Sequence, residues 1–117
     1  MIDTWSWVEY WRGRNETVRK YIDGPGEKLT SVITIAELER KFGRDADEMD
    51  AMIREIRQKS RIIPLHADLA RIAGSVRRDM KEGGIGDAII YATALRHKAR
   101  VLTGDPHFRV FPDVIMA

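Results

Sequence analysis

The sequence predicts an α/β fold of three layers, in which helices cover both faces of a central, mostly parallel sheet of four to five strands. Short apolar segments rich in β-branched residues alternate with longer segments of helical periodicity. Strands that are separated by helices pair in parallel through right-handed crossovers. The 117 residues suffice for one hydrophobic core. We therefore expect a single domain over residues 1–117.

The first half of the chain contains two expected strands and four expected helices. The breaker Asp23-Gly24-Pro25-Gly26 separates the second helix from the second strand. Ile35, Leu38 and Phe42 form the apolar stripe of the third helix. In chain order, the expected elements are a strand at 1–4, helices at 5–12 and 16–22, a strand at 29–33, and helices over 35–42 and after Asp45.

The second half repeats this alternation and contains the most apolar segment. Pro64 interrupts a short strand at 61–65, and proline in a strand indicates an edge position. Residues 88–95 are apolar almost all round, so we expect a buried central helix there. The other expected elements are an amphipathic helix at 69–80, which Gly83-Gly84 closes, and strands at 100–103 and 114–116.

The composition excludes several classes of protein. Cysteine is absent, which excludes disulfides and thiolate chemistry and fits a reducing compartment, so we expect a cytoplasmic protein. No apolar segment is long enough to cross a membrane, and no basic region precedes an apolar run at the start, as a signal peptide requires. The net charge of +2 fits an ordinary mixed surface and is compatible with a polyanionic partner.

Four acidic residues lie where an apolar strand ends or a helix begins: Asp3, Glu37, Asp87 and Asp105. Each has a structural interpretation of its own. Asp3 and Asp87 fit helix caps, and Asp105 fits an Asp-Pro turn. Glu37 fits a capping box that begins at Thr34. We expect Gly104 to free the backbone where the Asp105 side chain turns toward the sheet edge.

The four acids together favour a metal site. Strand-to-helix junctions of a parallel sheet open onto one edge, so the carboxylates should converge there. Two carboxylates about 4 Å apart repel by about 4 kcal/mol at an effective dielectric of about 20, and a cluster therefore requires protons or cations. Oxygen donors select hard cations, so we expect Mg²⁺ or Mn²⁺, and such a site suits phosphodiester hydrolysis.

Four segments of the chain, taken in order, resemble the PIN domain family, and most closely its VapC-type toxins: IDTWSWVEYWRG, TSVITIAELER, GIGDAIIYATAL and VLTGDPHF. The resemblance implies a PIN-like fold and a Mg²⁺- or Mn²⁺-dependent endoribonuclease that hydrolyses RNA. It also implies an antitoxin protein as a partner and a homodimer.

The resemblance assigns roles to individual residues. Asp3, Glu37, Asp87 and Asp105 match the four metal-binding and catalytic acids of the family. Thr103 matches a hydroxyl that supports the site two residues before the last acid, and Thr4 matches the hydroxyl after the first acid. The family often has a small residue at the position that Trp5 occupies here.

Other residues admit a role in RNA binding or a purely structural one. Trp7 and Trp11 are spaced i, i+4 and favour a packing stripe, whereas Trp5 is the better candidate for an exposed indole. We interpret His107 as a surface or turn residue, with a metal role as the alternative. An RNA path is the alternative to solvated helix faces for five basic residues: Arg12, Arg14, Arg77, Arg78 and Lys81.

Two other functional classes compete with the nuclease hypothesis. A phosphate-transfer enzyme would use a strand-end Asp as nucleophile, but its common form needs a second Asp at position 5, where Trp5 stands. A non-catalytic PIN-like module would bind RNA or protein without cutting. The presence of all four acids favours the nuclease.

Overall fold

Helices and strands alternate along the chain in the predicted order, with one element reduced. The computed structural model describes all residues from 1 to 117. The first expected strand is only a single bridge between Ile2 and Leu102. The elements are α1 (Thr4–Arg12), α2 (Glu16–Asp23), β1 (Leu29–Ser31), α3 (Val32–Phe42), α4 (Ala46–Lys59), β2 (Arg61–Ile63), α5 (Ala67–Asp79), α6 (Ile85–Arg96), β3 (Val101–Thr103), the 3₁₀ helix η1 (Pro106–Val110) and β4 (Val114–Met116).

The strands form two parallel pairs, which the N-terminal residues join. β1 pairs with β2, and β3 pairs with β4. Between the pairs, the Ile2 N–H donates to the carbonyl of Leu29 at 2.8 Å, and the Leu102 N–H donates to the carbonyl of Met1 at 2.8 Å. The expected parallel arrangement is confirmed, although each strand has only three residues. β2 lies at an edge, as Pro64 predicted.

The second strand ends earlier than the sequence indicated, because a helix begins inside it. Ser31 caps α3, and its side chain accepts from the Ile33 N–H at 3.2 Å. Val32 and Ile33, which are β-branched and favour strands, therefore form the first turn of α3. This start lies upstream of the predicted one and changes the interpretation of Glu37.

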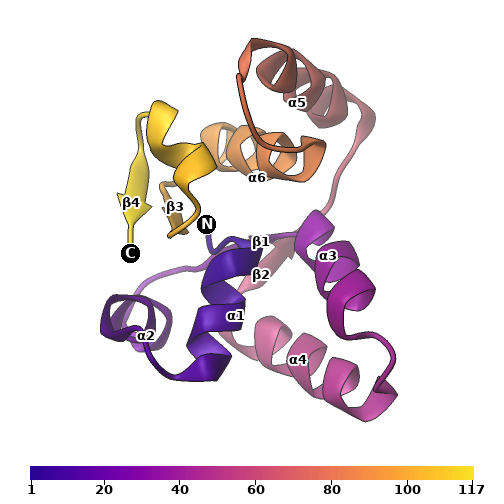
Figure 1. Ribbon diagram of the computed structural model, residues 1–117, viewed down its shortest axis with the longest axis vertical. Coiled ribbons are helices and arrows are strands. Elements are labelled where there is room, and N and C mark those ends of the chain that lie inside the picture. Colours follow the sequence, from indigo (N-terminus) through magenta and orange to yellow (C-terminus); the bar gives the residue numbers. More distant parts are fainter.

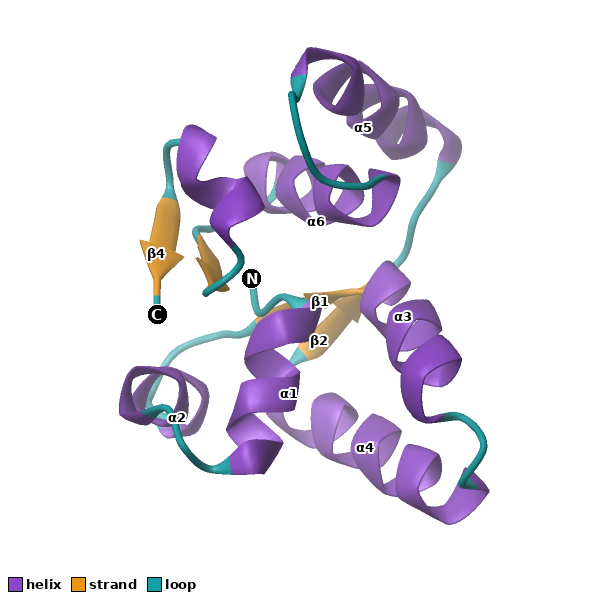
Figure 2. Ribbon diagram, in the orientation of Figure 1, coloured by secondary structure: helices purple, strands orange, loops and turns teal.

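Helices cover the strands on both faces. Figure 1 shows α5 and α6 on one side of β1 and β2 and the helices α1 to α4 on the other, and Figure 2 shows the short strands between these layers. α6 packs against β1 and β3, and all its residues from 88 to 94 are buried, which confirms the expected central helix. None of the helices has the length and apolar character that crossing a bilayer requires.

The first helix contributes a buried aromatic stripe. Trp7 is fully buried, stacks on Trp11 at a centroid distance of 5.6 Å, and donates its indole N–H to Thr30 Oγ1 at 3.1 Å. The predicted packing role of Trp7 and Trp11 is confirmed. This stripe fixes α1 against the sheet and thereby fixes Asp3 and Thr4 at its start.

Candidate metal centre

Asp3 is the buried acid of the site. It follows the Ile2 bridge, caps α1 and accepts a hydrogen bond from the Ser6 N–H at 2.8 Å. Burial raises the pKa of this carboxyl to about 7; hydrogen bonds from Thr103 and the Ser6 N–H partly offset the shift, and the charge of Asp105 adds to it. The cap interpretation is therefore correct, and the cap lies within reach of a second acid.

Thr103 joins two of the predicted site residues. It is fully buried at the end of β3, and its hydroxyl oxygen accepts from the Asp105 N–H at 3.0 Å. The same hydroxyl lowers the pKa of the nearby Asp3 carboxyl by hydrogen bonding. One side chain therefore neighbours both Asp3 and the backbone of Asp105.

Asp105 occupies the turn that the sequence indicated and also caps η1. Its carboxylate accepts from the His107 N–H at 2.9 Å. Gly104 has no positive φ, so backbone freedom does not explain it. Instead, a Cβ at position 104 would lie 2.3 Å from Cη2 of Trp5. The expectation that Gly104 frees the backbone is wrong; glycine is needed because the Trp5 indole lies against it.

Asp87 lies in the first turn of α6 rather than at its cap. Gly84 is the N-cap, and its N–H donates to Asp87 Oδ2 at 3.2 Å. Gly83 has a φ of +99°, and a Cβ there would lie 2.9 Å from Asp87 Oδ2. The predicted N-cap role of Asp87 is thus wrong by one helical turn, because α6 begins at Ile85. The glycine turn leaves the room that the carboxylate occupies.

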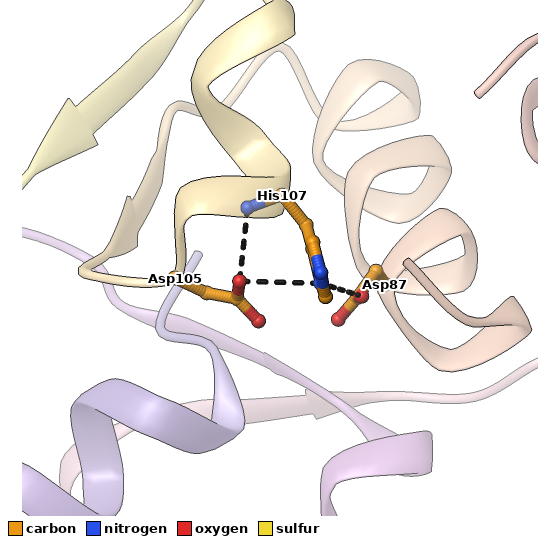
Figure 3. A group of neighbouring side chains, drawn as sticks. All are labelled: Asp87, Asp105 and His107. Carbon is orange, nitrogen blue, oxygen red and sulfur yellow. Dashed lines mark hydrogen bonds and ion pairs between the residues drawn. The ribbon is translucent and has the colours of Figure 1, made fainter. Parts of the chain in front are cut away.

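His107 lies between two of the acids. Its Nδ1 is 3.4 Å from Asp87 Oδ2 and 3.3 Å from Asp105 Oδ1. Figure 3 shows the imidazole pointing toward both carboxylates. Nδ1 is buried without a hydrogen-bond partner, and one donor atom from each of the three residues lies within 4.8 Å of the others. His107 is a half-exposed residue of the turn η1, as the sequence indicated, and its contacts also fit the alternative of a metal role; its place two residues after Asp105 was the only sequence signal.

Glu37 lies in the second turn of α3 and does not cap it. The capping-box interpretation is wrong, because α3 begins at Val32. The Thr4 hydroxyl donates to Glu37 Oε1 at 2.6 Å. A Cβ at Gly86 would lie 2.9 Å from Oε2, so Glu37 also reaches the start of α6. Glu37 and Asp3 stand outside the group of Asp87, Asp105 and His107.

A cleft of about 230 Å³ opens beside these acids. Glu37 and Asp105 lie in its wall, together with an aromatic side chain and three basic ones. The lining residues are Thr4, Trp5, Val8, Glu9, Arg12, Glu37, Arg40, Lys41 and Asp105. Two of the four junction acids, Glu37 and Asp105, therefore line one accessible hollow, whereas Asp3 and Asp87 do not line it.

The donor set fits a divalent cation. Asp87 and Asp105 supply carboxylate oxygens, and the unpartnered Nδ1 of His107 faces both of them. Buried polar atoms rarely remain without a partner, so this nitrogen indicates a position for a ligand. The donors are two oxygens and a nitrogen rather than the oxygens alone that the sequence indicated. Such a mixed set suits Mn²⁺ and other transition metals better than Mg²⁺.

Comparisons with known proteins agree with this fold. The PIN domain family profile matches residues 1–114. A search of curated proteins finds no match.

Three solved structures share the fold. A toxin–antitoxin complex from Klebsiella pneumoniae is 23% identical, with coverage of 98% of this chain and 94% of that one and a TM-score of 0.77. VapBC2 from Rickettsia felis, bound to a DNA fragment from its promoter, is 17% identical, with coverage of 100% and 96% and a TM-score of 0.79. Mycobacterium tuberculosis VapC20, a sarcin–ricin loop cleaving toxin, is 24% identical, with coverage of 86% and 85% and a TM-score of 0.64. At these identities the likeness establishes the fold, and because the family profile spans nearly the whole chain, this protein belongs to the PIN domain family.

Proposed function

We propose that this protein is a divalent-metal-dependent endoribonuclease and the toxin of a type II toxin–antitoxin pair. The observation that carries the proposal is the gathering of Asp87, Asp105 and His107 donor atoms within 4.8 Å of one another, beside a cleft that Glu37 and Asp105 line. Membership of the PIN domain family supports it. A single PIN domain over residues 1–117 suffices for this activity.

The roles of the side chains follow from their positions. Asp87, Asp105 and His107 would hold the cation, with Asp3 as a further acid near Asp105. When bound, a divalent cation would neutralise charge on the phosphate and lower the pKa of the attacking water. Thr103 would support both acids, through the Asp105 N–H and the Asp3 carboxyl. Glu37 faces the cleft and either orients the attacking water or contributes to a second cation, and the Thr4 hydroxyl holds its carboxylate.

The partners proposed are an RNA substrate, an antitoxin protein and a second copy of the chain, in the cytoplasm. Two of the structural neighbours, the Klebsiella pneumoniae toxin–antitoxin complex and Rickettsia felis VapBC2 on promoter DNA, support the antitoxin. The VapC20 neighbour is a toxin that cleaves the sarcin–ricin loop, which supports RNA as the substrate. Co-expression with the product of the adjacent gene tests the antitoxin, and a stable complex that suppresses cleavage is the expected result.

Cleavage of a mixed RNA preparation tests the catalytic proposal. We expect fragments with Mn²⁺ or Mg²⁺ and none with EDTA. Asp87→Asn should lower the rate by about 100-fold or more, because loss of even a supporting partner of a metal ligand costs 10- to 100-fold. Circular dichroism shows whether the variant is folded. Equal metal-dependent cleavage by the folded variant would contradict the proposal.

A further inference from the structure

Trp5 lies at the wall of the cleft, beside the acids and partly exposed. It is the second residue of α1, two residues after Asp3, and it lines the cleft together with Glu37 and Asp105. Trp7, two residues further on, is fully buried. The two indoles of this segment therefore have different environments, and only that of Trp5 lines the cleft.

The Trp5 indole is held in place by its benzo edge. A Cβ on Gly104 would lie 2.3 to 2.7 Å from Cη2, Cζ2 and Cζ3 of Trp5, so the ring edge rests against the backbone that leads into Asp105. Other parts of the side chain pack at the margin of the hydrophobic core. An aromatic ring fixed in this way loses little further entropy when a second ring stacks on it.

The cleft also carries positive charge that forms no ion pair. Arg40 and Lys41 follow Glu37 by three and four residues on α3, so helical spacing places them on the same face as Glu37. Both are exposed, both line the cleft, and neither forms an ion pair. Arg12, in contrast, pairs with Glu9 at 3.1 Å. Free cations at a cleft that also contains an aromatic ring are the features that bind a nucleic-acid single strand.

We propose that Trp5 is the base-stacking residue of the cleft, and that Arg40 and Lys41 bind the phosphates next to the stacked base. The proposal rests on the proposed nuclease function and names the side chains that hold its RNA substrate. A hollow of about 230 Å³ is far too small for a base-paired helix. Bases inside a duplex are already stacked, so only an unpaired base can present its face to Trp5. The carboxylates of Glu37 and Asp105 repel a peptide carboxylate and an RNA phosphate alike, so the preference for RNA rests on the stacking surface of Trp5.

A binding comparison separates the base from the backbone. The Asp87→Asn protein, which should bind without cutting, is titrated in Mn²⁺ with a labelled oligouridylate and with a ribose–phosphate oligomer of equal length that lacks all bases. Fluorescence anisotropy gives the dissociation constants. The base-bearing oligomer should bind about 5- to 100-fold more tightly, because stacking contributes that much per base. Adding Trp5→Ala should bring the ratio of the two dissociation constants close to one, and Trp5→Phe should keep part of the preference for the base-bearing oligomer.

The basic residues should act on both oligomers alike. Adding Arg40→Gln and Lys41→Gln should weaken the binding of both oligomers by the same factor. The slope of log affinity against log salt concentration should fall by the equivalent of about one to two phosphate contacts. The matched control is Arg14→Gln with Lys20→Gln, two exposed basic residues that do not line the cleft, and it should leave both dissociation constants unchanged.

Tryptophan fluorescence covers the case in which Trp5→Ala does not fold. Oligouridylate should quench the fluorescence of the Asp87→Asn protein, the oligomer without bases should not, and Trp5→Phe should remove the quenching. An unchanged base preference in folded Trp5→Ala, quenching that persists in Trp5→Phe, or binding of an acidic peptide but of neither oligomer overturns the proposal. The base preference without any metal-dependent cleavage by the wild-type protein would contradict the nuclease function and leave the stacking role standing.

Discussion

The site has a buried half and an open half, which are built differently. In the buried half, Asp3 is 2% exposed and Thr103 is fully buried, and both have hydrogen-bond partners. In the open half, the side chains of Asp87 and His107 are 19% and 39% exposed, and His107 Nδ1 has no hydrogen-bond partner. The buried half is organised before any ligand arrives, whereas the open half keeps polar atoms available for one.

The buried half contains a carboxyl group whose ionisation destabilises the folded protein, and the open half shows no such group. The pKa of Asp3 rises to about 7 because burial disfavours the charged carboxylate. Strained or unfavourable ionisation of this kind is common at functional sites, where a bound partner compensates for it. The contrast predicts that substitutions in the two halves change activity in the same direction but change stability in different ways.

The largest expected effect comes from comparing Asp3→Asn with Asp105→Asn. Asp105→Asn removes a proposed ligand of the cation, and Asp3→Asn removes the acid whose charge lies near Asp105, so RNA cleavage should fall by about 100-fold or more in both. Only Asp3→Asn should raise the stability of the metal-free protein at neutral pH. The asparagine keeps the volume and the acceptor for the Ser6 N–H, and it removes the buried ionisable group. Thermal unfolding in EDTA at pH 7.5 measures the difference.

The pH dependence of the free energy of unfolding shows whether ionisation of Asp3 destabilises the fold. Between its usual pKa of 3.8 and its folded pKa of about 7, Asp3 holds a proton in the folded state that the unfolded chain releases. The free energy of unfolding therefore falls as pH rises through this window, by at most about 4 kcal/mol. Asp3→Asn should flatten that part of the profile relative to the wild-type protein. Parallel wild-type and Asp3→Asn profiles from pH 4 to 7.5 would show that Asp3 ionises normally.

The sequence predicts the order of the α-helices and strands and the approach of Asp87 to Asp105, because both follow from local patterns. Hydrophobic periodicity and turn residues located the α-helices, and strand-to-helix junctions of parallel strands share an edge. The start of α3 was missed because Val32 and Ile33 favour strands locally, while Ser31 caps a helix in the folded protein. The direction of the His107 ring depends on η1, and a five-residue 3₁₀ helix leaves no periodic signal.

Contacts between distant segments were beyond the reach of the sequence. Gly104 lies against Trp5, and Gly86 lies against Glu37, in both cases across a large separation along the chain. A glycine in the sequence indicates a turn or a close approach but does not name its neighbour. These two glycines therefore belong to the site only once the fold is known.

A smaller effect is expected from His107→Gln, which tests whether the open half prefers Mn²⁺ to Mg²⁺. His107→Gln removes an imidazole nitrogen that faces Asp87 and Asp105. Because Mg²⁺ selects oxygen donors, the variant should lose about tenfold in Mn²⁺ affinity and little in Mg²⁺ affinity. Isothermal titration calorimetry with each metal measures both constants. His97→Gln is the matched control at an exposed histidine, and an equal loss for both metals in His107→Gln would exclude a nitrogen ligand.

The smallest effect should come from Gly86→Ala, which moves a carboxylate without removing it. The added Cβ would lie 2.9 Å from Glu37 Oε2, so the flexible end of Glu37 must shift away from α6 and disturb the 2.6 Å hydrogen bond from Thr4. We expect cleavage to slow by about threefold, because small displacements of a positioned group lower the rate. Stability should change little, since the helical preference of alanine, worth about 1 kcal/mol, offsets the crowding.

Gly74→Ala provides the comparison for Gly86→Ala. Gly74 also lies in a helix, α5, and a Cβ there would meet no atom within 4 Å. Gly74→Ala should raise the free energy of unfolding by up to about 1 kcal/mol and leave the cleavage rate unchanged. Single-turnover cleavage and urea unfolding of both variants give the two quantities. If Gly86→Ala cleaves as fast as Gly74→Ala, the contact between Glu37 and α6 has no part in catalysis. The functional residues of the open half would then be Asp87, Asp105 and His107 alone.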